Sequence, residues 1–262
     1  MRTSKTMHFT YNDILTRWKE KKIDSTADLD VMLGNFRVLF AYNSNRIEGS
    51  ELTIHQTREI FENGKVIGYT GDLRALFEAE NQRVCYEYLK DKIVSKEIIS
   101  EKLILSIQEK LCHGCYDESR WQKGERPGTY KKNYYGVGLS VGVLPEDVPE
   151  EVRYICDEFN DQKLDNPEKI LKAAAWFHCS FERIHAFADG NGRVGRTLLN
   201  YILMINNLPP VIIFDEDKET YYMALEVFDH TDKIDGFVQF LKEQSVKTWT
   251  RRNLRGEEFI CI

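Results

Sequence analysis

The sequence has no long apolar run. No stretch approaches the roughly 18 consecutive apolar residues that a membrane helix needs. Residues 1–12, which include Arg2 and Lys5, also lack the apolar stretch of a signal peptide. A membrane protein and a secreted protein are therefore disfavoured, and the predicted location is the cytoplasm.

Excess positive charge is absent too. Lys and Arg together number 36 against 42 Asp and Glu, for a formal net charge of -6. This balance gives no general attraction to nucleic acid or to an anionic membrane, so any anion site must be local. No internal repeat or low-complexity linker is visible, and 42% apolar residues over 262 positions supply a substantial core.

The cysteines form no disulfide framework. Six are scattered across the chain, which predicts free thiols. Cys112 and Cys115 have the CxxC spacing of a redox pair or of half a zinc site. The chain lacks a second CxxC and the flanks have helical periodicity, so both of these readings are disfavoured.

Most segments have apolar residues spaced three and four apart, which predicts α-helices. The expected helices span 26–47, 54–62, 71–93, 100–112, 149–160, 167–184, 191–206 and 235–249. Residues 126–144 differ, because glycines and Pro127 punctuate apolar residues with period-two alternation, which indicates a hairpin or extended flap. The predicted fold class is all-α with a small β-hairpin flap.

A polar, glycine-rich loop lies between two apolar helices, with the sequence His185-Ala-Phe-Ala-Asp-Gly-Asn-Gly-Arg-Val-Gly-Arg196. Gly190, Asn191 and Gly192 permit unusual backbone angles at the start of the following helix. Unpaired N–H groups and the helix dipole favour an anion there. The loop therefore predicts a phosphate site.

Four charged or titratable side chains surround that predicted site. Arg193 and Arg196 are three residues apart, so both can bind phosphate from one side of the helix. Asp189 offers a hard oxygen ligand for Mg²⁺, and His185 can accept a proton near neutral pH. Each residue alone is commonplace, but the combination indicates chemistry on a nucleotide.

The loop resembles the HxFx(D/E)GNGRxxR signature of the Fic family, whose members most often transfer AMP from ATP to a protein hydroxyl. The resemblance covers roughly residues 98–244 and implies the mostly helical Fic fold. The implied organisation is an N-terminal helical region at 1–97, a Fic core at 98–250 and a C-terminal tail at 251–262. Ala186 stands where the family usually has proline, which leaves His185 less preorganised but removes no catalytic group.

The resemblance also implies a role for each site residue. The catalytic residues would be His185, as the general base, and Asn191, and the magnesium ligand would be Asp189. The remaining assignments are Gly190, Asn191 and Gly192 for an anion hole, Arg193 and Arg196 for the outer phosphates, and Tyr222 and Asp229 for the adenosine pocket.

A second motif, Ser44-Asn-Arg-Ile-Glu48-Gly49, resembles the (S/T)xxxE(G/N) inhibitory motif of Fic proteins. On its own it reads as a helix end with glycine just beyond it. Beside the loop, it implies that Glu48 pairs with Arg196 and displaces the γ-phosphate of ATP. The chain would belong to the class whose inhibitory helix is N-terminal.

The segment with Tyr130, Lys131, Tyr134 and Tyr135 has two readings. It is either a surface hairpin or, as the resemblance implies, a flap that docks a target through its free strand edges.

The lead hypothesis is a protein adenylyltransferase that uses ATP and Mg²⁺. Its partner would be a protein with a Ser, Thr or Tyr hydroxyl, with the chain itself as one candidate, and a homodimer is left open. The alternatives are a hydrolase that removes AMP with Glu48 positioning water, a transferase of another phosphate-linked group, and a nucleotide-gated binding module in which Ala186 marks decayed catalysis. A DNA-binding regulator is disfavoured, because no helix-turn-helix appendage is apparent and the net charge is acidic.

Overall fold

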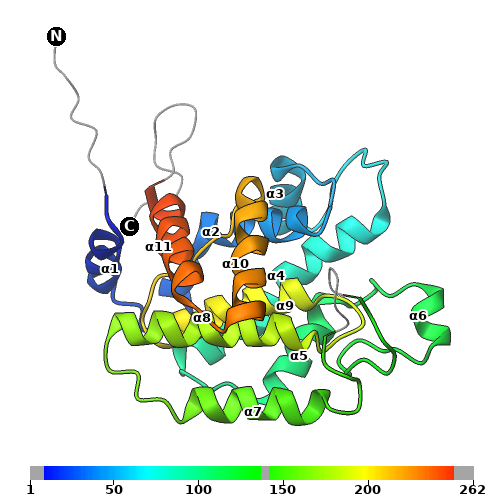
Figure 1. Ribbon diagram of the computed structural model, residues 1–262. Coiled ribbons are helices and arrows are strands. Elements are labelled where there is room, and N and C mark those ends of the chain that lie inside the picture. The colour runs from blue at the N-terminus through cyan, green and yellow to red at the C-terminus, as the bar shows by residue number, and fades with distance from the viewer. Residues whose placement is uncertain (1–8, 137–141, 251–262) are drawn as a thin grey trace.

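The computed structural model describes residues 9–136 and 142–250. Within these ranges it contains α-helices, one short 3-10 helix and no strand (Figure 1). The elements are α1 (Tyr11–Glu20), α2 (Thr26–Ile47), α3 (Ile54–Asn63), α4 (Leu73–Val94), α5 (Glu101–Leu111), α6 (Glu118–Gln122), α7 (Val148–Asn160), α8 (Pro167–Ile184), α9 (Asn191–Ile205), η1 (Asp215–Asp217), α10 (Lys218–Thr231) and α11 (Asp235–Thr250). The helical fold class is confirmed.

Local capping explains where several helices begin. The Ser25 hydroxyl caps α2, and Thr53 caps α3 through a reciprocal capping box with Gln56. Asn166 caps α8, with Pro167 at its first position. These signals lie in the sequence, and the eight predicted helices all form with ends within two residues of the expected ones.

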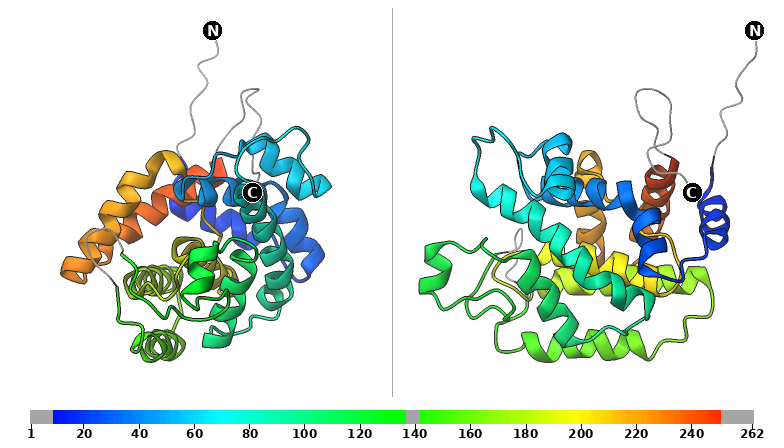
Figure 2. Two further views of the ribbon diagram at one scale, coloured as in Figure 1. Left: turned by 90° about the vertical axis from the view of Figure 1, so that its right-hand side faces the viewer. Right: turned by 180° about the vertical axis from the view of Figure 1, so that it is seen from behind.

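The centre of the fold is the pair α8 and α9, which pack along each other. α8 also contacts α7, α10 and α11, whereas α9 contacts α2, α4 and α5. The left view of Figure 2 shows α7 and α8 end-on, with α10 and α11 on one side and α4 and α5 on the other. The loop between α8 and α9 is thereby placed among elements from both halves of the chain.

The N-terminal helices share the core of the rest of the chain. The largest cluster of buried apolar residues runs from Ile14 in α1 to Trp249 in α11. Trp18 lies 5.2 Å from Trp249 between ring centroids, and Phe36 of α2 stacks on the same indole at 5.8 Å. The division at residue 97 stays a prediction, and the expected tail at 251–262 lies outside the described residues.

The predicted flap is described only at its two arms, 130–136 and 142–144, and neither arm is a strand. The backbone N–H of Lys131 donates to the Ala186 carbonyl at 3.0 Å, and that of Val143 donates to the Ile184 carbonyl at 3.1 Å. Both arms thus bind the backbone on either side of His185. The expected hairpin centre falls on residues 137–141, which lie outside the described residues.

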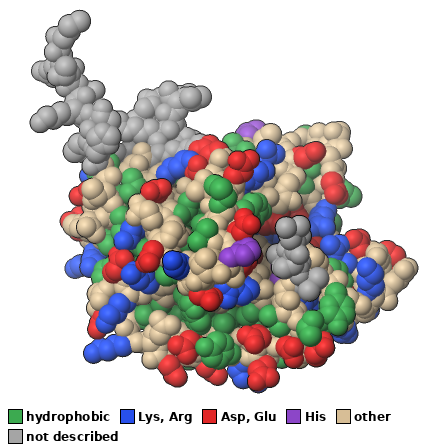
Figure 3. All heavy atoms as spheres, viewed as in Figure 1, with side chains coloured by type: hydrophobic (Ala, Val, Ile, Leu, Met, Phe, Trp, Pro, Cys, Tyr) green, Lys and Arg blue, Asp and Glu red, His purple; other side chains and the backbone are tan. Residues whose placement is uncertain are grey.

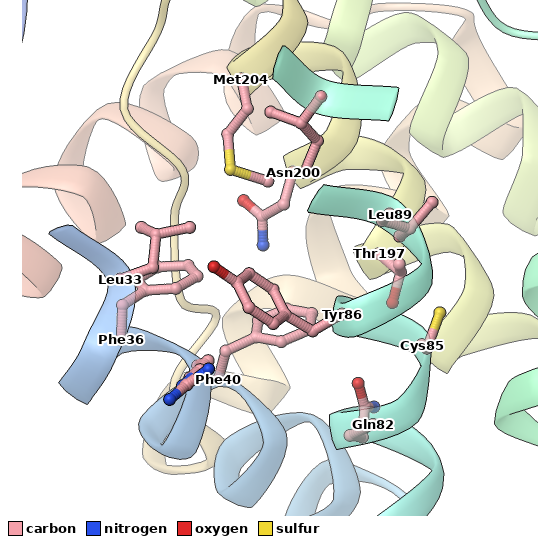
Figure 4. Close-up of a pocket in the computed structure, with 12 residues that line it drawn as sticks. Leu33, Phe36, Phe40, Gln82, Cys85, Tyr86, Leu89, Thr197, Asn200 and Met204 are labelled. Atoms are coloured by element: carbon pink, nitrogen blue, oxygen red, sulfur yellow. The ribbon is translucent and has the colours of Figure 1, made fainter. Parts of the chain in front are cut away.

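A small apolar cavity of about 50 Å³ separates α2 and α4 from α9 (Figure 4). Its polar wall includes Asn200, whose amide bonds both the N–H and the carbonyl of Val211. The cavity lies beside Phe36 and Phe40, before the end of α2 that carries Ser44.

On the face drawn in Figure 3, acidic and basic side chains are interspersed over the described surface. None of the described helices is long and apolar enough to cross a membrane.

Candidate active site

The loop between α8 and α9 has a defined backbone shape. His185 ends α8 in the left-handed conformation with a φ of 50°, and its N–H donates to the Phe181 carbonyl at 3.2 Å. Gly190 is also left-handed, with a φ of 85°, at the N-cap of α9. Left-handed backbone is costly for a residue other than glycine, so the surrounding contacts must hold His185 in place.

The Asn191 side chain closes this loop from inside. Its Oδ1 accepts from the Phe187 N–H at 2.9 Å, and its Nδ2 donates to the Phe187 carbonyl at 2.8 Å. Phe187 is fully buried and stacks against Tyr130. The Asn191 amide is therefore engaged with the loop backbone, and the structure supports a positioning role for this residue.

Replacing Asn191 by alanine should lower the free energy of unfolding by about 2–4 kcal/mol, because it leaves the buried N–H and carbonyl of Phe187 without hydrogen-bond partners. Chemical denaturation measures this loss. Asn206→Ala is the control, since its amide makes one bond to the Ile202 carbonyl at the end of α9. Equal, small losses in the two variants would contradict the loop-closing role.

The amino end of α9 is open to an anion. Its N-cap residue, Gly190, has no side chain, so the N–H groups of the first turn are not taken by an N-cap side chain. A Cβ on Gly190 would collide with Cys112 Sγ, and a Cβ on Gly192 would collide with the Glu48 carboxylate and lie 2.8 Å from Arg196 Nη1. Glycine at these positions therefore lets Cys112, Glu48 and Arg196 approach the backbone of the helix end closely.

Arg196 binds the end of α2. Its Nε donates to the Ser44 hydroxyl at 3.0 Å, and its Nη2 donates to the Ser44 carbonyl at 2.9 Å and to Glu48 Oε1 at 2.7 Å. Gly49 follows with a φ of 93° and ends the helix as expected. The predicted contact between Glu48 and Arg196 is present in the structure.

The two side chains of this ion pair differ in burial. The Arg196 side chain is 2% exposed, whereas that of Glu48 is 34% exposed. A buried guanidinium needs a counter-charge, so an anion is required next to Arg196 whether Glu48 or a phosphate supplies it. Glu48 thus occupies a position that suits a phosphate group.

Asp189 and Arg193 belong to a second charge cluster. Asp189 accepts from Arg193 Nη2 at 3.1 Å and from Arg74 Nη2 at 2.6 Å. Glu78 lies 3.1 Å from Arg193 Nη1 and 2.9 Å from Arg74 Nε. Both acids are thus shared between two guanidinium groups, and a cation that binds Asp189 must compete with Arg74.

His185 sits at the edge of these charges. Burial, followed by the positive charge of Lys131, lowers the pKa of His185 from 6.5 to about 4, against the opposing effect of Glu48 and Asp189. The imidazole is therefore neutral at pH 7 and able to accept a proton.

Comparison with known proteins identifies the loop and its helices. Residues 98–203 match the model of the Fic/DOC family. These residues form a Fic domain. The match begins just before α5 and ends within α9, so it includes the whole loop from His185 to Arg196.

Several relatives resemble the chain well beyond the Fic domain. It is 33% identical over 223 residues to a protein adenylyltransferase fic-1 from Caenorhabditis elegans, a match that covers 84% of this chain and 42% of the relative. It is 32% identical over 216 residues to a protein adenylyltransferase Fic from Nematostella vectensis, covering 79% of this chain and 46% of that protein. The chain thus spans less than half the length of these curated relatives.

Solved structures show the same fold. A Fic domain-containing signaling protein from Bacteroides thetaiotaomicron matches with a TM-score of 0.78 and 25% identity, covering 91% of this chain and 93% of that one. Fic-1 from C. elegans matches with a TM-score of 0.72 and 29% identity, covering 91% of this chain and 67% of that chain. The helices outside the family match thus also belong to a recurring architecture.

The residues expected in the adenosine pocket of the Fic domain lie on α10. Tyr222 is 47% exposed and packs against Tyr221. Burial raises the pKa of Tyr222, and the charge of Glu48 is the next cause, so the phenol lies near the Glu48 carboxylate. Asp229 instead pairs with Arg183 Nε at 3.1 Å. Their roles toward adenosine stay predictions.

The four flap residues differ in burial: Lys131 is buried, Tyr130 and Tyr135 are partly buried, and Tyr134 is exposed. Tyr130 stacks on Phe187, Lys131 is buried, and the Tyr135 hydroxyl donates to Glu125 at 3.1 Å. Tyr134 is 63% exposed. Among these four flap residues, Tyr134 is therefore the side chain best placed to meet a partner.

Sequence reasoning missed Arg74 and Glu78. Both lie on α4, outside the resemblance and more than 100 residues before the loop. Arg74 and Glu78 are four residues apart, which is the spacing of an ordinary surface pair on a helix. No local signal distinguishes them from such a pair.

Proposed function

We propose that the chain is a protein adenylyltransferase that moves AMP from ATP to a Ser, Thr or Tyr hydroxyl of a protein. The observation that carries the proposal is the arrangement of a neutral His185, an uncapped α9 amino end and the buried Arg196 around one loop. The names of the relatives, protein adenylyltransferases from C. elegans and N. vectensis, support it.

The chemistry follows from these positions. The imidazole of His185 takes the proton of the target hydroxyl, and the oxygen forms a bond to the α-phosphorus of ATP. The bond between that phosphorus and the oxygen bridging to the β-phosphate breaks, and pyrophosphate leaves. N–H groups at the start of α9 stabilise charge on the phosphate oxygens, and Arg193 and Arg196 bind the outer phosphates.

The residues present fit a magnesium ion. Mg²⁺ in nucleotide sites is usually held by one or two carboxylates together with substrate phosphates and water, and Asp189 is such a carboxylate beside the phosphate site. Asp189 would hold the ion, which would supply positive charge to the phosphate oxygens. Its pairing with Arg74 and Arg193 keeps the carboxylate fixed at that place.

We propose that the chain is autoinhibited. Glu48 bonds the guanidinium that a γ-phosphate needs, and it lies over Gly192 at the start of α9. ATP can then bind only in a pose in which its α-phosphate is not presented to the target. The inhibitory glutamate is the C-cap residue of α2, upstream of the Fic domain.

A second candidate, removal of AMP from a modified protein, uses the same site. It is favoured by the 34% exposure of the Glu48 side chain, because a carboxylate that reaches solvent beside the loop can position water. The test is intact-mass analysis of candidate proteins incubated with the chain, ATP and Mg²⁺. Added AMP supports the lead proposal, and loss of AMP from a premodified protein supports the second.

Tyr134 should matter for the target and not for the nucleotide. Tyr134→Ala should lower the rate of target modification at least about tenfold, because it removes one aromatic contact that docking of the target would bury. The affinity for ATP should change little. Tyr135→Ala is the matched neighbour, since its hydroxyl bonds Glu125 within the fold. The rate of AMP transfer to a protein target and a calorimetric titration with ATP measure the two properties in each variant. A Tyr134→Ala variant that binds ATP poorly would contradict the docking role.

A further inference from the structure

Lys131 is not placed as a docking side chain. It is 2% exposed, although it lies in the flap segment that the resemblance assigns to the target. Lysine is rarely buried this deeply, because its ammonium loses hydration. Its position therefore calls for a role inside the protein.

The backbone of Lys131 ties the flap to the loop. Its N–H donates to the Ala186 carbonyl at 3.0 Å, one residue after His185. On the other side, the Val143 N–H donates to the Ile184 carbonyl at 3.1 Å. His185 is thus held between two bonds from the flap arms, which restrains its left-handed backbone without the proline common at position 186.

The side chain of Lys131 flanks His185. A Cβ on Gly142 would lie 2.9 Å from His185 Cβ and 3.3 Å from Lys131 Nζ. The ammonium and the histidine side chain therefore approach the same point, and only a glycine leaves room for both. In this buried setting a positive charge on the imidazole is repelled by the ammonium.

The charges around His185 act in opposite directions. The Lys131 ammonium disfavours a second positive charge on the imidazole, and burial does the same. Glu48, at the C-cap of α2, and Asp189 from the loop favour that charge. Both carboxylates are partly neutralised by Arg196 and by Arg74 with Arg193.

We propose that Lys131 is a positioning residue for His185: its backbone fixes the loop, and its ammonium, beside the His185 side chain, disfavours a positive charge on the imidazole that serves as the base. The second half of this statement rests on the proposed function, because only a transfer reaction needs His185 as a base. The electrostatic pairing itself does not depend on that reaction.

The test is a proton NMR titration of the histidine ring signals in the full chain, with the His185 signal assigned by its loss in His185→Ala. In Lys131→Met the pKa of His185 should rise by about one unit toward its ordinary value. Lys131→Arg, which keeps the charge, should restore most of the parental titration. Lys132→Met is the matched control, because Lys132 is the exposed neighbour with the same charge, and it should leave His185 unchanged.

An unchanged His185 titration in a folded Lys131→Met variant would overturn the proposal, and so would equal shifts in Lys131→Met and Lys131→Arg. If Lys131→Met does not fold, Lys131→Gln repeats the test with a polar side chain in the same space. The acid limb of kcat/KM for adenylylation should move to higher pH in the uncharged variants. If no variant transfers AMP while the titration shifts as expected, the proposed function fails and the pairing stands.

Discussion

Glu48→Gly should raise the rate of adenylylation by about ten- to a hundredfold. A charge-assisted hydrogen bond in a sheltered site contributes about 1.5–3 kcal/mol, and each 1.4 kcal/mol corresponds to a factor of ten. Removing the Glu48 carboxylate frees the Arg196 guanidinium, which is 2% exposed and then takes a phosphate as its counter-charge. Initial rates of AMP incorporation into a target and into the chain itself measure the gain.

Two further variants separate inhibition from a general loosening of α2. Glu48→Gly with Arg196→Ala should lose the gain in rate, because the guanidinium that would bind the γ-phosphate is then missing. Glu51→Gly removes an exposed carboxylate three residues later and should leave the rate unchanged. A folded Glu48→Gly variant that binds ATP and is no faster than the parent would end the inhibitory assignment of Ser44 to Gly49.

His185→Ala, made in the Glu48→Gly background, should lower the transfer rate by about 10²–10⁴-fold. The imidazole moves a proton, whereas the phosphates are bound by α9 and its arginines, so ATP affinity should change little. Burial together with Lys131 keeps the pKa of His185 near 4. The base is therefore already neutral from pH 6 to 8, and kcat/KM should fall only as the pH drops toward that value.

His55→Ala is the control for His185→Ala, because the His55 side chain is 81% exposed and lies on α3. Made in the same Glu48→Gly background, it should match the Glu48→Gly protein in both transfer rate and ATP affinity. Joint loss of ATP binding and transfer in His185→Ala would show that His185 holds the nucleotide or the loop, and the base assignment would be wrong.

Helices that carry their own signals were predictable from sequence. Asn166 and Pro167 open α8, and Gly49 ends the α2 region, because these residues act on the backbone next to them. α1, α6 and α10 were missed. α6 has only five residues, and α10 exposes Tyr222, Met223 and Val227, so apolar side chains lie off its buried face and blur the helical period.

The loop was predictable as a phosphate site, but its surroundings were not. Glycines before a helix indicate anion binding through local geometry, whereas the Arg74 contact with Asp189 joins residues 115 positions apart. The contact between Arg196 and Glu48 spans 148 positions and was expected only through family resemblance. The burial of Lys131 and the engagement of the Asn191 amide depend on packing across the loop, which a linear pattern does not encode.

The most direct test of the account is intact-mass spectrometry of the Glu48→Gly chain and of Glu48→Gly with His185→Ala, each incubated with ATP, Mg²⁺ and a cell lysate. The account predicts added AMP, on the chain or on lysate proteins, with the first and none above background with the second. AMP added equally by both would show that His185 is not the base. AMP added by neither, from folded proteins that bind ATP, would contradict the proposed adenylyltransferase.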